Sequence, residues 1–308
     1  MRLATTIGDF QGYCETQAQM VRAYEGTGFR HLDYSFYRLN YDGSPFMTDD
    51  WVKNIADAAK EAEKLGFDFV QAHSPSNDYF NSDRETVIKG NIRSIEACAY
   101  LGIDRLVVHS GRTRKLKMPD DRKTYLTEIK GFYEALYPAM EKYNVRVLAE
   151  NYLPADNGEC SLASGEDMAE LADMCAHPLL GVCWDVGHAN LINPDQYGDI
   201  VKLGERLCAV HIQDNMGIRD DHICPLMGTL DIDGVMRGLK DNGFIDRGGV
   251  FTFECDNIVS FAGSWPNYRH KSGETVAAEP TLEIKRTAVR LMYEIGKNIL
   301  TEYGCFEE

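Results

Sequence analysis

Short apolar segments alternate with longer segments of helical pattern along the whole chain, and this alternation constrains the fold more than any other feature. The apolar runs predict eight strands, at Leu3–Ile7, His31–Phe36, Phe67–His73, Arg105–His109, Arg146–Glu150, Gly181–Asp185, Leu207–His211 and Gly249–Glu254. Helices are predicted at Cys14–Tyr24, Asp50–Lys64, Arg84–Tyr100, Lys123–Tyr143, Glu166–Cys175, Gln196–Arg206, Ile232–Asp241 and Pro280–Glu302. Strands that alternate with helices run parallel and are joined by right-handed crossovers.

Eight strand–helix units in 308 residues match a (β/α)8 TIM barrel. Gly66 and Gly102 stand where a helix would end before the next strand, which supports the predicted boundaries. A doubly wound parallel sheet is the alternative architecture. No low-complexity linker interrupts the pattern, so we predict one α/β domain that spans residues 1–308.

The charge balance restricts the partners of this chain. Its formal net charge is −16, which disfavours a general affinity for nucleic acid or anionic lipid. No run of 18 apolar residues predicts a membrane-spanning helix. The nine cysteines include no C-x-x-C pair and suit free thiols in a reducing compartment. We therefore expect a cytoplasmic protein whose partner is a small molecule, without a membrane or nucleic-acid partner.

A polar residue ends every predicted strand from the third onwards. These strand-terminal residues are His73, His109, Glu150, Asp185, His211 and Glu254. In a barrel they would converge on one mouth, where active sites lie. Several carboxylates gathered there would need a cation to offset their repulsion. Two glutamates, one aspartate and one histidine (Glu150, Glu254, Asp185 and His211) make a mixed oxygen and nitrogen site that suits Mn²⁺, Mg²⁺, Co²⁺ or Zn²⁺.

Other residues near the expected mouth have two interpretations each. His188 follows Asp185 by three residues and either stabilises a turn or binds substrate or a second metal. Asp220 and His222 lie in the long connection 215–230 and are either a metal-ligand pair or ordinary loop residues. A second long connection, 256–279, follows the last strand. Long connections in compact domains are usually functional or disordered.

A basic segment follows the fourth strand in this acidic chain. It carries four cationic side chains, at Arg112, Arg114, Lys115 and Lys117. If the segment folded over the mouth, it would hold an anionic substrate, because guanidinium groups match phosphate oxygens. If it points outward, the substrate is a neutral sugar. We favour the second arrangement, since long side chains lose much entropy on ordering.

Three segments resemble the xylose isomerase-like TIM-barrel superfamily, which contains sugar phosphate isomerases, epimerases and endonuclease IV-type enzymes. They are residues 148–151 (Leu-Ala-Glu-Asn), 184–188 (Trp-Asp-Val-Gly-His) and 210–214 (Val-His-Ile-Gln-Asp). Ketose 3-epimerases of this group bind one divalent metal, for which manganese is the first choice. The resemblance assigns its ligands to Glu150, Asp185, His211 and Glu254, and assigns substrate binding to His188 and, through a loose alignment, Arg219.

The same superfamily also implies a different metal site. Endonuclease IV-type enzymes hold three zinc ions with additional ligands, which would fall on His73, His109, Asp220 and His222. In an epimerase, His73 and His109 would instead bind substrate. A homo-oligomer is expected from the resemblance alone.

We therefore predict a divalent-metal-dependent sugar or sugar-phosphate isomerase or epimerase. A metal would stabilise an enediolate, while Glu150 and Glu254 remove and return a proton as acid and base. The alternatives are a zinc phosphodiesterase of the endonuclease IV type, another lyase of the superfamily such as a C-glycoside-cleaving enzyme, and a sugar-binding barrel without catalysis.

Overall fold

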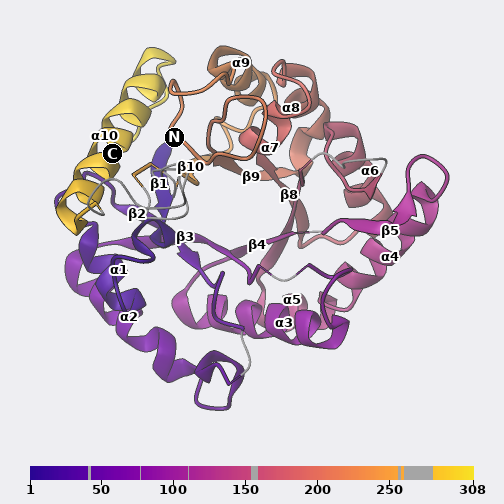
Figure 1. Ribbon diagram of the computed structural model, residues 1–308, viewed down its shortest axis with the longest axis horizontal. Helices are drawn as coiled ribbons and strands as arrows, with labels where there is room; N and C mark the ends of the chain where they lie inside the picture. Colours follow the sequence, from indigo (N-terminus) through magenta and orange to yellow (C-terminus); the bar gives the residue numbers. More distant parts are fainter. Residues whose placement is uncertain (41–42, 77, 110, 154–158, 256–257, 260–279) are drawn as a thin grey trace, which may run out of the picture.

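Eight parallel strands close into a barrel in the computed structural model, which describes residues 1–40, 43–76, 78–109, 111–153, 159–255, 258–259 and 280–308 (Figure 1). Around the barrel the strands follow the order β1-β10-β9-β8-β6-β4-β3-β2. Their bounds are β1 Arg2–Thr6, β2 His31–Ser35, β3 Asp68–His73, β4 Arg105–His109, β6 Arg146–Glu150, β8 Leu180–Asp185, β9 Leu207–Ile212 and β10 Val250–Phe253. The closed order confirms the TIM barrel and excludes the doubly wound alternative.

Helices surround this barrel (Figure 1). They are α1 Gln17–Ala23, α2 Val52–Leu65, α3 Arg84–Leu101, α4 Arg122–Glu134, α5 Tyr137–Tyr143, α6 Gly165–Cys175, α7 Val186–Asn190, α8 Tyr197–Leu203, α9 Ile232–Asp241 and α10 Leu282–Glu302. Gly66 and Gly102 end α2 and α3 in the left-handed conformation, as their positions in the sequence predicted. No helix in the described ranges is both long enough and apolar enough to cross a membrane.

The observed elements differ from the predicted ones in two places. The single helix predicted at Lys123–Tyr143 is two helices, α4 and α5, that meet at Ala135 and Leu136. Pro138 lies in the first turn of α5, where its missing backbone N–H costs nothing, whereas the interior of one long helix would not tolerate it. The basic segment after the fourth strand is not a plain loop, since Thr113–Lys117 forms strand β5 and pairs antiparallel with β7, Glu159–Cys160.

A small apolar cluster occupies one side of the barrel interior beneath the site described below. It consists of Val107, Leu148, Cys183 and Ala209, contributed by the neighbouring strands β4, β6, β8 and β9. Because alternate residues of a strand share a face, the next side chain to enter the barrel lies two positions further along each strand. Those positions are His109, Glu150, Asp185 and His211. The strand period thus carries four polar residues into one layer at the carboxyl end of the barrel.

Candidate metal centre and active-site pocket

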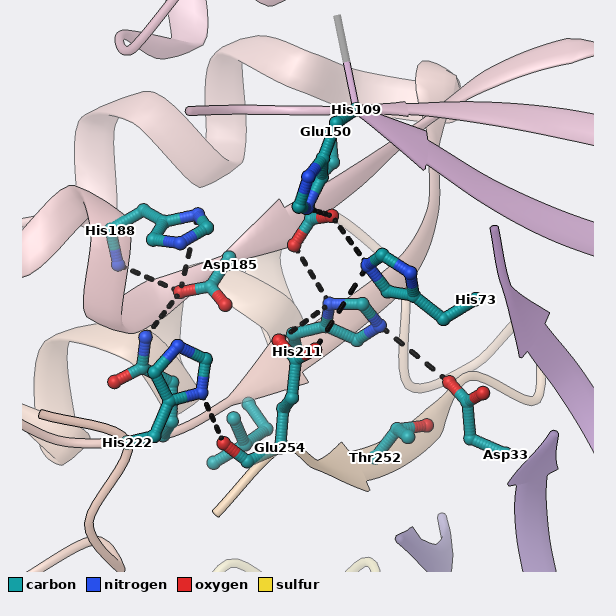
Figure 2. A network of polar contacts seen from close by, with 12 residues as sticks. Asp33, His73, His109, Glu150, Asp185, His188, His211, His222, Thr252 and Glu254 are labelled. Carbon is teal, nitrogen blue, oxygen red and sulfur yellow. Dashed lines mark hydrogen bonds and ion pairs between the residues drawn. The ribbon is translucent and has the colours of Figure 1, made fainter. Parts of the chain in front are cut away.

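Four predicted metal ligands meet at this end of the barrel (Figure 2). Each of Glu150, Asp185, His211 and Glu254 offers one ligand atom, and these atoms all lie within 4.8 Å of one another. The Nδ1 atom of His211 is 2.8 Å from Glu150 Oε1 and 3.2 Å from Glu254 Oε2. Glu150 and Asp185 are fully buried, whereas the Glu254 side chain keeps 19% of its surface exposed.

Two further histidines, His73 and His109, lie close to Glu150. His109 Nε2 lies 2.8 Å from Glu150 Oε2, and His73 Nε2 lies 3.3 Å from the same oxygen. His73 donates its Nδ1 hydrogen to the carbonyl oxygen of Ser74, at 2.9 Å. That bond leaves Nε2 of His73 free to face the carboxylates. His73, His109 and Glu150 thus form a second group with the spacing of metal ligands.

A third group combines His188 with the Asp-x-His pair of the β9–α9 connection. Asp220 Oδ2 lies 2.8 Å from His222 Nε2 and 3.4 Å from His188 Nε2. Both imidazoles direct Nδ1 to a backbone carbonyl, that of Asn151 for His188 and that of Glu254 for His222. Such bonds fix a ring and leave Nε2 as the ligand atom. The structure therefore brings these predicted residues together with the central four.

The carboxylates and imidazoles of the cluster shift one another's pKa values. Burial and the nearby carboxylates raise the pKa of Asp185 to about 7, although His188 acts in the opposite direction. Burial alone would raise the pKa of Glu254, but His211 outweighs it and lowers this pKa to about 2. Burial alone would lower the pKa of His73, but the Glu150 carboxylate raises it to about 9. Imidazolium groups therefore compensate the carboxylates in the absence of a cation.

The surroundings of the Asp185 carboxylate indicate that these residues suit a cation. Its Oδ2 atom is buried and has no hydrogen-bond partner among the described residues. Figure 2 places the Asp185 carboxylate between His188 and His211. A buried carboxylate oxygen without a partner is costly, and a divalent cation would compensate it. The donor set therefore fits a metal ion.

A pocket of about 300 Å³ opens above the cluster. This volume is at the lower end of the range for small-molecule sites. Its lining includes His73, His109, His188, Asp220, His222 and Glu254, together with Tyr37, Tyr152, Gln11 and Ser35. Glu150, Asp185 and His211 lie behind this lining. The pocket thus presents histidines, two carboxylates and two tyrosines to a bound molecule.

Arg219 does not reach the pocket. Its side chain is 58% exposed and its Nε atom lies 2.5 Å from Asp221 Oδ1. Arg114, in the basic segment, is 77% exposed and pairs with Glu159 at 2.5 Å. Arg112, in the same segment, lies close to the pocket, because its guanidinium is 5.9 Å from the ring centre of Tyr152, which lines it.

Two residues that contact the site, Gln213 and Asn151, were not predicted from the polar residues at the strand ends. Gln213 donates to Asp220 Oδ1 at 2.7 Å and to Asp185 Oδ1 at 3.3 Å, and so connects two of the ligand groups. Its position two residues after His211, which continues the alternation of β9 just beyond its last residue, Ile212, is the signal that could have identified it. Asn151 exchanges hydrogen bonds with the backbone of Asp185, and it directly follows Glu150.

Comparisons with known proteins agree with this architecture. A family model described as "Xylose isomerase-like TIM barrel" matches residues 23–277. An uncharacterised protein of Sinorhizobium fredii, y4fM, is 31% identical over 152 residues, which are 49% of this chain and 47% of that protein. The uncharacterised protein MJ1311 of Methanocaldococcus jannaschii is 27% identical over 171 residues, or 54% of this chain and 55% of that protein. The chain thus spans about half the length of the curated relatives it matches.

Solved structures share the fold at low sequence identity. A D-tagatose 3-epimerase-like protein has a TM-score of 0.74 at 18% identity, over 99% of this chain and 98% of that one. An IOLI protein with a bound zinc atom has a TM-score of 0.72 at 15% identity, with 100% of both chains covered. D-psicose 3-epimerase from Clostridium cellulolyticum H10, solved with D-tagatose, has a TM-score of 0.71 at 15% identity, over 97% and 99% of the two chains.

Proposed function

Because this chain belongs to the xylose isomerase-like TIM barrel family, we propose that it is a divalent-metal-dependent isomerase or epimerase of a sugar or sugar phosphate. One observation carries the proposal: two glutamates, an aspartate and a histidine offer ligand atoms within 4.8 Å of one another beneath a pocket of about 300 Å³. Several structural neighbours are sugar epimerases, which supports a small carbohydrate as substrate.

Glu150, Asp185, His211 and Glu254 would hold one divalent cation, with Mn²⁺ as the first choice. Oxygen and imidazole nitrogen ligands also suit Mg²⁺, Co²⁺ or Zn²⁺. When bound there, the metal would polarise the substrate carbonyl and its adjacent hydroxyl, which favours an enediolate. The structural neighbour with bound zinc supports a metal in this kind of barrel.

The two glutamates would act as acid and base from different depths. Glu254 lines the pocket and would exchange a proton directly with the carbon beside the sugar carbonyl. Glu150 lies behind the lining, but His109 lines the pocket and bonds to it at 2.8 Å. A proton held by Glu150 would therefore reach substrate through His109. His188 and His73 would orient the hydroxyl groups of the sugar.

The test combines metal loading with a substrate panel. Chelator-treated protein would be loaded separately with Mn²⁺, Mg²⁺, Co²⁺ and Zn²⁺ and assayed for interconversion of ketoses, aldoses and their phosphates. We expect interconversion of at least one sugar that requires the metal. Metal binding without conversion of any of these sugars would contradict the proposal.

A second candidate is a zinc phosphodiesterase of the endonuclease IV type. It is favoured by the two additional ligand groups, His73 with His109 and Glu150, and His188 with Asp220 and His222. Together with the central group they could hold three cations. Metal analysis separates the candidates, because one tightly bound ion per chain favours the isomerase and three favour the phosphodiesterase. Hydrolysis of bis(p-nitrophenyl) phosphate by the zinc-loaded protein would support the second candidate.

A further inference from the structure

The two oxygens of the Asp185 carboxylate have different surroundings. Oδ1 accepts a hydrogen bond from the backbone N–H of His188 at 2.7 Å (Figure 2) and a second one from the side-chain amide of Gln213 at 3.3 Å. Oδ2 is buried and has no hydrogen-bond partner among the described residues. The carboxylate is therefore held through one oxygen, and the other oxygen is left for a ligand.

The amide nitrogen of Gln213 lies between two carboxylates. Besides Asp185 it contacts Asp220, to whose Oδ1 it donates at 2.7 Å. Carboxylate oxygens accept hydrogen bonds, so two of them within reach require the NH₂ group of the amide, and not its oxygen, on this side. The shorter bond to Asp220 anchors the amide, and the longer one reaches Asp185. Within the described part of the chain, Gln213 is the side chain that donates a hydrogen bond to Asp185.

Close packing also restrains the Gln213 amide. The residue is fully buried, and a Cβ added to Gly187 would lie 2.0 Å from Gln213 Cδ and 2.3 Å from its Nε2. The amide therefore lies directly against the backbone of Gly187. Its oxygen, Oε1, is buried without a hydrogen-bond partner among the described residues, which costs free energy. The contacts of Nε2 with Asp185 and Asp220 give a reason for a glutamine at this position in spite of that cost.

We propose that Gln213, anchored on Asp220, is a positioning residue for Asp185. Its amide restrains the carboxylate through Oδ1, so that Oδ2 is presented to a divalent cation. The amide carries its N–H donors at every pH, so this role does not depend on the protonation of a neighbouring histidine. The inference rests on the proposed metal function of the central ligand group. Loss of a hydrogen-bond partner of a ligating carboxylate typically lowers metal affinity by about 10–100-fold.

The test measures Mn²⁺ binding by isothermal titration calorimetry on the full chain, independently of turnover. Gln213→Met has a side chain of similar length without a donor, and it is expected to weaken Mn²⁺ binding by about 10–100-fold. The electron paramagnetic resonance spectrum of the Mn²⁺-saturated variant is expected to differ from that of the unmodified protein, because the Asp185 carboxylate is no longer restrained. Loss of stability alone would not change the spectrum of the bound ion.

Gln196→Met is the matched control. Gln196 is also fully buried, but its amide donates to the carbonyl oxygen of Val186 at 2.7 Å and accepts from Trp184 Nε1 at 3.0 Å. Its loss is expected to lower the melting temperature of the metal-free protein. Mn²⁺ binding should stay within threefold of the unmodified protein, with the same spectrum.

Equal weakening of Mn²⁺ binding in Gln213→Met and Gln196→Met would overturn the inference, because the effect would then follow from a general loss of packing. If Gln213→Met does not fold, Gln213→Asn takes its place. It keeps the amide but is one methylene shorter, so the donor is withdrawn from both carboxylates. This variant is expected to weaken Mn²⁺ binding at least fivefold, and unchanged binding would overturn the inference.

The outcomes also distinguish this inference from the proposed function. Unmodified protein that binds no divalent cation would overturn both. Unmodified protein that binds Mn²⁺, with Gln213→Met within threefold of it, would overturn the role of Gln213 alone.

Discussion

His109 and Glu150 are register partners on the neighbouring strands β4 and β6, and their side chains meet at 2.8 Å between Nε2 and Oε2. This contact joins a fully buried carboxylate to a residue that lines the pocket. It also makes His109 a residue for which the two candidate functions predict different results.

For an isomerase, we expect His109→Ala to lower turnover at least tenfold, because Glu150 loses its route to substrate. The variant should retain one bound metal, since His109 is not in the central ligand group. Turnover and metal content would be measured on the same sample. Loss of one metal from a total of three would instead favour the phosphodiesterase.

Glu254→Gln is expected to lower turnover by about 10²–10⁴-fold, the range typical of a general acid or base. Metal content must be measured alongside, because Glu254 is also a proposed ligand. Glu141→Gln is the matched control: its carboxylate pairs with His177 and is 68% exposed. Near-normal turnover in Glu254→Gln would refute the mechanism with two glutamates.

Metal affinity is expected to fall as pH falls below about 7. The pKa of Asp185 in the metal-free protein is raised to about 7, and the cation requires the ionised carboxylate. Protons therefore compete with metal for the Asp185 carboxylate below that pH, and the raised pKa of His211, another proposed ligand, adds competition at higher pH. Each proton released changes the apparent affinity by roughly tenfold per pH unit. Titration with Mn²⁺ at pH 5.5, 6.5 and 7.5 checks this. The same affinity at all three values would show that no proton is displaced.

Arg114→Ala should leave turnover on a sugar and on its phosphate unchanged within twofold. Its partner is Glu159 and its side chain is 77% exposed, so it does not line the pocket. Arg112→Ala is the informative comparison, because that guanidinium lies above Tyr152. A tenfold loss confined to the phosphorylated substrate in Arg112→Ala would contradict our expectation of a neutral sugar.

Gly187→Ala is expected to destabilise the fold by about 1–3 kcal/mol through overpacking. An added Cβ would lie 2.0 Å from Gln213 Cδ, which belongs to the polar network around Asp185. Gly131→Ala is the matched control, since the same addition on the exposed face of α4 meets no atom within 4 Å. The control should be stabilised by about 0.5–1 kcal/mol, because alanine favours a helix over glycine. Chemical denaturation of both variants checks the difference in sign.

Local pattern was enough to predict the barrel and much of the candidate site. Strand alternation is a period-two signal, so a polar residue two positions beyond an apolar core residue must enter the barrel on the same face. Cys183 and Asp185, or Leu148 and Glu150, are such pairs. Once the strands are parallel and closed, their carboxyl ends meet, and the terminal side chains converge without further information.

Contacts between residues distant in the sequence determined the features that local pattern did not predict. Arg219 pairs with Asp221 and is not among the residues that line the pocket, and this pairing depends on how the β9–α9 connection folds. The basic segment became β5 because β7, more than 40 residues away, supplied its backbone partners. Asp33 and Gln71 carry no motif, and only closure of the barrel brings them beneath His211. The period of each strand can be read from the sequence. Which side chains become neighbours depends on the register between strands and on burial, and both exist only in the folded chain.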